Sequence, residues 1–132
     1  MTQSIVHVAI VVDDYDTAIH HYTQQLGFTL TEDKRMSETK RWVLVTPHGS
    51  ACSLLLAVAS TEEQKRHIGN QTGGRVFLFL HTDNFERDYE RLQLHGIEIV
   101  RPYSNEPHGK VAVFKDHYGN LWDLIEPIKQ PM

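Results

Sequence analysis

Apolar and polar residues follow an order along this chain that occurs twice. Residues 4–12 (SIVHVAIVV) and 75–81 (RVFLFLH) are rich in branched and aromatic side chains, which is typical of β-strands. Each run is followed by acidic residues that can cap a helix and then by an amphipathic segment, which ends at Gly27 or Gly96. Further strands are predicted at residues 28–33, 41–46 and 51–58 in the first copy, and at 97–101, 110–115 and 121–126 in the second.

This order predicts two βαβββ modules. The first module covers residues 1–59 and the second covers residues 75–132. Residues 60–74 between them are polar and form the predicted linker, with a short helix near residues 61–67. A single module would leave one sheet face uncovered. The repeat therefore predicts one α+β domain over residues 1–132, in which a curved mixed sheet surrounds a cleft.

Composition excludes several classes of protein. A net charge of −4 over 132 residues gives no basic surface for nucleic acid. Cys52 is the only cysteine, which rules out an internal disulfide and fits a reducing compartment. No run of about 18 apolar residues is present, so no membrane span is expected. We predict a cytoplasmic protein.

The segment from residue 114 to residue 124, FKDHYGNLWDL, resembles a signature of the vicinal oxygen chelate superfamily, F-x-D-P-x-G-N-x-x-E-L. His117 stands in place of the proline and Asp123 in place of the glutamate. His7 in the first strand and the helix end Tyr22…Leu26-Gly27-Phe28 add to this resemblance, which covers nearly the whole chain. The superfamily includes glyoxalases, bleomycin-resistance proteins, fosfomycin-resistance enzymes and extradiol dioxygenases. The resemblance implies the two-module fold and a homodimer with clefts lined by both chains.

The resemblance also implies positions for a divalent metal, one on the first and one on the fourth strand of each module. The acidic caps align the first strands, and Gly49 and Gly119 align the fourth. The four positions are then His7, Ser53, Phe77 and Asp123. Phenylalanine has no donor atom and a serine hydroxyl is a poor ligand, so we expect no metal site and no cofactor. The alternative is a divergent site for zinc, nickel or iron, and His81 lies about 13 Å from Phe77 along the strand, too far to complete it.

Strand alternation predicts which side chains would line the cleft. They are mainly apolar or aromatic: His7, Ala9, Val11, Trp42, Leu44, Phe77, Phe79, His81, Phe114, Leu121, Asp123 and Ile125. An apolar pocket with a few polar groups is typical of a small-molecule site. The predicted ligand-binding residues are His7, Trp42, Phe77, Phe79 and Asp123, and the predicted partner is a small, flat, aromatic molecule. Each aromatic residue could instead fill the core, and Trp122, on the opposite face of its strand, is expected to pack under a helix.

Two further features could contribute to this cleft. The loop at residues 102–109 contains Tyr103 and His108 and could act as a lid. Three arginines at strand ends could meet an anionic ligand or could simply be solvated: Arg41, Arg75 and Arg101.

Two classes of function follow. The first is a binding or resistance protein that holds a small molecule without metal, and the ligand count favours it. The alternative is a lyase, isomerase or dioxygenase of the glyoxalase type, in which a divalent metal polarises the substrate's oxygens. Acid–base catalysis by His7 and Asp123 without metal is a third possibility, although no catalytic residue is singled out.

Overall fold

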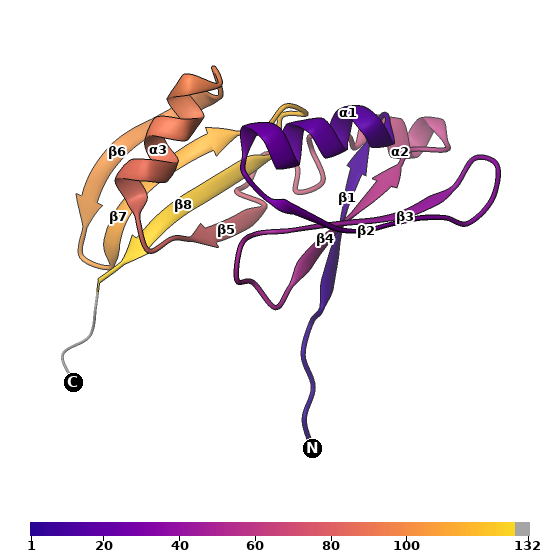
Figure 1. Ribbon diagram of the computed structural model, residues 1–132. Helices are drawn as coiled ribbons and strands as arrows, with labels where there is room; N and C mark the ends of the chain where they lie inside the picture. The colour runs from indigo at the N-terminus through magenta and orange to yellow at the C-terminus, as the bar shows by residue number, and fades with distance from the viewer. Residues whose placement is uncertain (129–132) are drawn as a thin grey trace. The chain divides into compact units, whose positions relative to one another are not determined.

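The computed structural model describes residues 1–128 of the chain. They form two compact units, Met1–Ile68 and Gly69–Met132, the second described as far as residue 128. In each unit a helix lies across one face of a four-stranded mixed sheet (Figure 1). This confirms the predicted α+β class with two βαβββ modules. The predicted linker is divided between the units, because its short helix belongs to the first.

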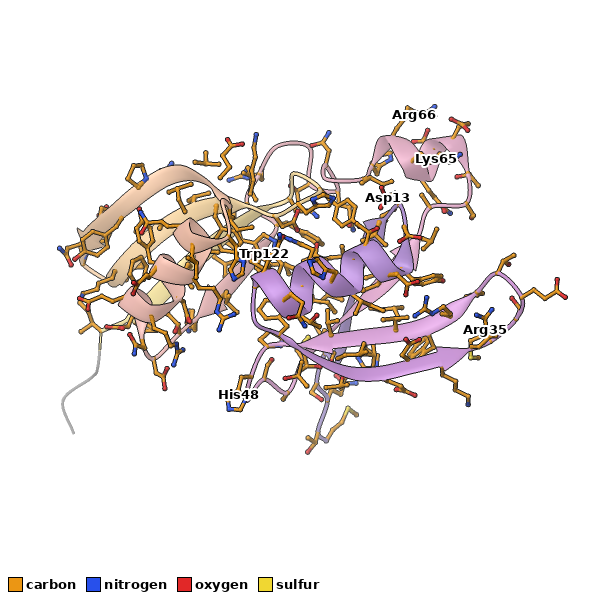
Figure 2. All side chains as sticks on the ribbon, turned by 45° about the horizontal axis from the view of Figure 1, so that its top comes forward. Asp13, Arg35, His48, Lys65, Arg66 and Trp122 are labelled. Carbon is orange, nitrogen blue, oxygen red and sulfur yellow. The ribbon has the colours of Figure 1, made fainter. Side chains whose placement is uncertain are left out.

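Unit one contains four strands in the order β1-β4-β3-β2. Strand β1 is parallel to β4, and the other neighbours are antiparallel. Figure 2 marks Arg35 near the tip of the β2–β3 hairpin and His48 in the turn between β3 and β4. The elements are β1 (His7–Val12), α1 (Tyr15–His20), a π-helical turn η1 (His21–Gln25), β2 (Thr29–Arg35), β3 (Arg41–Thr46), β4 (Ser53–Val58) and α2 (Glu62–Arg66).

Unit two repeats this topology with the strand order β5-β8-β7-β6. Strand β5 is parallel to β8, and the other neighbours are antiparallel. The elements are β5 (Leu78–His81), α3 (Phe85–Leu94), β6 (Glu98–Glu106), β7 (Gly109–Lys115) and β8 (Leu121–Pro127).

The core of unit one lies between its sheet and α1. Asp14 caps α1, because its carboxylate accepts a hydrogen bond from the Thr17 amide at 2.8 Å. Ala18 on α1 and Tyr22 on η1 are fully buried. The sheet contributes the apolar side chains of one face, which strand alternation and register place together: Ile10, Val12, Val43, Val45, Leu54 and Leu56.

The core of unit two lies between its sheet and α3, and it corrects one prediction. Phe114 was expected in the cleft, but it pairs directly with Trp122 across β7 and β8. Their rings stack at 5.7 Å between centroids, and both side chains are buried. Register partners project to the same face, so Phe114 packs on the helix side with Trp122. Phe85 and Leu92 of α3 complete this core.

The predicted lid is also wrong. Residues 102–109 were expected to form a loop, but β6 continues through Glu106 and pairs with β7 as far as Glu106 opposite Gly109. Two shifts in register, between Ile99 and Arg101 and between Arg101 and Ser104, allow the strand to pass Pro102, which cannot donate to the sheet. The segment is an outer strand and has no open loop that could close.

No helix within residues 1–128 is long and apolar enough to cross a membrane.

Candidate functional site

The sheet face of unit one that lies opposite α1 has a mostly apolar surface. The register sets its members, because Ala9, Leu55 and Leu44 lie level with one another on β1, β4 and β3. We call this surface face one, and it consists of His7, Ala9, Val11, Trp42, Leu44, Thr46, Ser53, Leu55 and Ala57. On the outer strand β2 the register places Glu32 level with Leu44 and Lys34 level with Trp42, so one acidic and one basic side chain border face one along this edge.

Two of the predicted ligand-binding residues meet on face one. The imidazole of His7 and the indole of Trp42 lie edge to face, with 5.9 Å between ring centroids and 73° between ring planes. His7 precedes Ala9 by two residues and Trp42 precedes Leu44 by two, on strands of opposite direction. The rings therefore meet diagonally across the apolar row, which the twist of the sheet permits.

A row of hydroxyl groups borders the apolar part of face one, and only one of its members had been considered from sequence. Thr31 Oγ1 lies 2.9 Å from Thr46 Oγ1, which lies 2.7 Å from Ser53 Oγ. Ser53 is in turn level with His7. Thr31 reaches this row because the register of β2 shifts between Leu30 and Glu32. Thr46 has the same parity as Trp42 and Leu44 in β3, so strand alternation is enough to place it on this face. Thr31 could not be placed in this way, because a β-bulge leaves no signal in the sequence.

The face of unit two opposite α3 carries a different set of groups. We call it face two; its members are Phe79, His81, Arg101, Val111, Val113, Asp123 and Ile125. One row crosses all four strands, from Phe79 through Asp123 and Val113 to Arg101. Phe79 is 64% exposed, so it does not fill the core of its unit.

Asp123 is the acidic side chain of this row. Partial burial raises the pKa of Asp123, because desolvation disfavours its charged form. The positive charges of Arg101 and His108 lower the pKa of Asp123 and so oppose this effect. The carboxyl group is thus held on an apolar surface between Phe79 and Val113, with basic side chains near enough to act on it.

The register changes the correspondence between the implied metal positions. Asp123 is level with Phe79, whereas the Phe77 amide bonds to the Leu121 carbonyl one step further along. The counterpart of Asp123 in unit one is therefore Leu55, because Leu55 is level with Ala9. The alignment through Gly49 and Gly119 had paired Asp123 with Ser53, two residues away from the pairing that the register gives. The difference arises because three residues separate Gly49 from β4, whereas one residue separates Gly119 from β8.

The donor set around these positions is poor in metal ligands. His7 is level with Ser53, and Asp123 has Phe79 and Val113 as its neighbours on the flanking strands. No group of three or more histidine, cysteine or acidic side chains that could hold a metal ion occurs within residues 1–128. Hydroxyl and apolar side chains do not suit zinc, nickel or iron(II).

The signature segment builds a turn. The buried carboxylate of Asp116 accepts hydrogen bonds from the backbone amides of Tyr118, Gly119 and Asn120 at 3.0–3.1 Å. It also accepts bonds from the side chains of Asn120 and Trp122, each at 3.0 Å. Gly119 has φ 106°, which glycine adopts without strain. These residues carry the family resemblance because they fix the β7–β8 connection, so they identify the fold and leave the ligand open.

The suggestion that Arg41 meets an anionic ligand is wrong. Its guanidinium bonds to Asp33 of β2 at 2.7 Å and to Asp16 of α1 at 2.9 Å, and it lies over the ring of Tyr15. The Tyr15 hydroxyl also accepts a hydrogen bond from the Arg41 amide at 3.1 Å. Arg41 therefore projects to the helix side of the sheet, opposite to Trp42, and joins α1 to β2 and β3.

Comparison with known proteins gives the family. The chain belongs to the Glyoxalase/Bleomycin resistance protein/Dioxygenase superfamily, whose family model matches residues 4–124. A relative from Shewanella frigidimarina, an uncharacterized protein, is 59% identical over 100% of both chains.

Solved structures agree with this assignment. UcmS2 is 30% identical with a TM-score of 0.82, over 96% of this chain and 99% of its own. TnmS3, an antibiotic binding protein from Streptomyces sp. CB03234, is 28% identical with a TM-score of 0.76, over 96% of this chain and 98% of its own.

Proposed function

We propose that this protein binds a small, flat, aromatic molecule without a metal ion, as a binding or resistance protein and not as a glyoxalase-type enzyme. The observation that carries the proposal is the composition of face one, where His7 and Trp42 meet over an apolar row. Aromatic rings with a few polar groups suit a planar ligand. The similarity to TnmS3, an antibiotic binding protein, supports the same class of function.

Face two supports the proposal from the second unit. The exposed ring of Phe79 offers a stacking surface, and Asp123 beside it offers a polar group that can orient a ligand. Phe79 and Val113, which flank Asp123, supply no metal ligand. This argues against the metal-dependent alternative, because a catalytic metal normally needs three protein ligands. The roles of His7, Trp42, Phe77, Phe79 and Asp123 in binding are part of this proposal.

Equilibrium dialysis with 2-methoxynaphthalene, a planar aromatic probe, tests the proposal. Trp42→Ala and Phe79→Ala should each weaken binding by roughly 1–3 kcal/mol, the value of burying a large apolar side chain. Tyr103→Ala, which removes an aromatic ring that packs against Phe85 of α3, should leave binding unchanged. Urea denaturation of each variant separates a role in binding from a role in the core. A large fall in the urea midpoint, with unchanged affinity in the folded fraction, would mean that the residue only fills the core.

We further propose that the protein is a cytoplasmic homodimer. Its single cysteine suits a reducing compartment. The family resemblance supports a dimer, and light scattering at micromolar concentration should give twice the chain mass of 15.2 kDa. A mass of one chain would contradict the dimer.

A further inference from the structure

In the hydroxyl row of face one, the number of available protons determines which hydroxyl group donates to which. Thr31, Thr46 and Ser53 each carry one hydroxyl proton, and each hydroxyl oxygen can accept as well as donate. The contacts within reach are Thr31 with Thr46, Thr46 with Ser53, and Thr31 with the carbonyl oxygen of Leu44 at 3.3 Å. The carbonyl can only accept.

One arrangement uses all three protons in these three contacts. Thr31 donates to the Leu44 carbonyl, Thr46 donates to Thr31, and Ser53 donates to Thr46. The reverse arrangement makes only the two bonds between hydroxyls and leaves the carbonyl contact unused. Since hydrogen bonds in a chain polarise one another, the arrangement with three bonds is favoured.

The consequence for a ligand lies at Ser53. In the favoured arrangement its proton points to Thr46, so its oxygen offers lone pairs and no proton. Ser53 lies on face one, level with His7 and next to the apolar row. We infer that the ligand of face one carries a hydrogen-bond donor, such as a phenolic hydroxyl, at the edge of its aromatic ring, and that Ser53 Oγ accepts from it.

This inference rests on the proposed function and narrows the class of ligand. A planar aromatic molecule without a donor would find the apolar row and Trp42 but would leave the Ser53 oxygen desolvated. An unmade hydrogen bond of this kind costs more than a made one contributes, so the row discriminates between otherwise identical molecules.

Two probes that differ by one methyl group test the inference, 2-naphthol with a donor and 2-methoxynaphthalene without one. In equilibrium dialysis the unmodified protein should bind 2-naphthol about 3- to 10-fold more tightly, the effect of one neutral hydrogen bond. Ser53→Ala should remove the preference. Thr46→Val, which keeps the shape but frees the Ser53 proton, should reduce it. Ser60→Ala, which removes a hydroxyl bonded to Gln64 away from face one, should leave it unchanged.

The outcomes separate the two proposals. Equal binding of both probes, with no effect of Ser53→Ala, would overturn the inference and leave the proposed function intact. Binding of neither probe would overturn both. A preference for 2-naphthol that survives Ser53→Ala in a protein with an unchanged denaturation midpoint would also overturn the inference, because another acceptor would then be responsible.

Discussion

Phe79 and Asp123 lie directly level with each other on the parallel strands β5 and β8. Side chains at such positions share a face and stand on strands about 5 Å apart. A carboxylate that could serve as a metal ligand therefore has a phenyl ring at the position from which a second ligand would reach it. Val113 occupies the corresponding position on the other side.

The first prediction is that this row binds metal only after both neighbours are replaced. Phe79→His with Val113→His should give two imidazoles and one carboxylate in one row, a set that suits zinc or nickel. Calorimetric titration should then give near-stoichiometric binding. The control Phe79→His with Leu94→His also introduces two imidazoles but places one of them on α3, at a side chain that is 80% exposed. Stoichiometric metal in the unmodified protein, lost on Asp123→Ala, would contradict the prediction.

The second prediction concerns Arg41, whose side chain is 19% exposed and bonded to Asp33 and Asp16. Arg41→Met should lower the free energy of unfolding by about 1–2 kcal/mol at neutral pH, because hydrogen bonds between charged groups are stronger than neutral ones. The control Arg87→Met removes ion pairs of a side chain that is 59% exposed. It should cost less than Arg41→Met, because ion pairs on the protein surface contribute little to stability.

The Arg41 contribution should also depend on pH. The hydrogen bond from Arg41 lowers the pKa of Asp33 from its usual value of 3.8. The stabilisation is then complete above 3.8 and is lost as the pH falls through the lower pKa of the folded state. Urea midpoints from neutral to acid pH should converge for the unmodified protein and Arg41→Met. A constant gap down to the lowest pH would contradict the assignment.

The third prediction concerns the carboxylate of Asp116. Its removal in Asp116→Ala leaves several buried donors without their acceptor, so we expect a loss of about 3–5 kcal/mol in unfolding free energy. Trp122→Phe removes one of these bonds and reduces the packing, and should cost less. Asp13→Ala, at an exposed position just before α1, should have an effect within about 0.5 kcal/mol. Guanidinium denaturation ranks the three variants, and a mild effect of Asp116→Ala would show that water replaces the carboxylate.

The fourth prediction concerns Asp123, whose pKa burial raises above 3.8. At a pH between the unfolded and folded pKa values of this group, the folded state binds more protons than the unfolded state. The free energy of unfolding therefore falls as the pH rises through this interval, and the loss remains at higher pH. Asp123→Asn should remove this dependence, and its stability relative to the unmodified protein should increase from acid to neutral pH. Arg101→Met removes an opposing positive charge and should strengthen the dependence. If the stability of Asp123→Asn relative to the unmodified protein instead decreased from acid to neutral pH, the surroundings of Asp123 would favour its charged form.

Local physics accounts for most of what could be read from the sequence. The apolar run RWVLVT placed a strand at Arg41–Thr46 with the observed bounds. The amphipathic pattern that ends at Gly96 placed a helix where the structure has α3, but the residue that caps this helix is Asn84 and not an acidic residue. The cap at Asp14 depends on hydrogen bonds within four residues, and the end of the helical segment at Gly27 on backbone freedom at one position. Such features follow from neighbours along the chain, so the repeat and the family were accessible without coordinates.

The features that failed or were missed depend on how strands are paired. The turn before β8 is two residues shorter, counted from its glycine, than the turn before β4. Asp123 is therefore level with Phe79 and not with Phe77. The pairing of β7 with β8 moved Phe114 under the helix, since only the register tells which face a residue shares with its partner. The bulge in β2 brought Thr31 to the hydroxyl row. The sequence by itself determined the elements, the repeat and the family, because these rest on local periodicity and turn chemistry. The tertiary structure alone decided which side chains stand next to His7, Ser53 and Asp123, because cross-strand register is set by long-range pairing and by turn lengths.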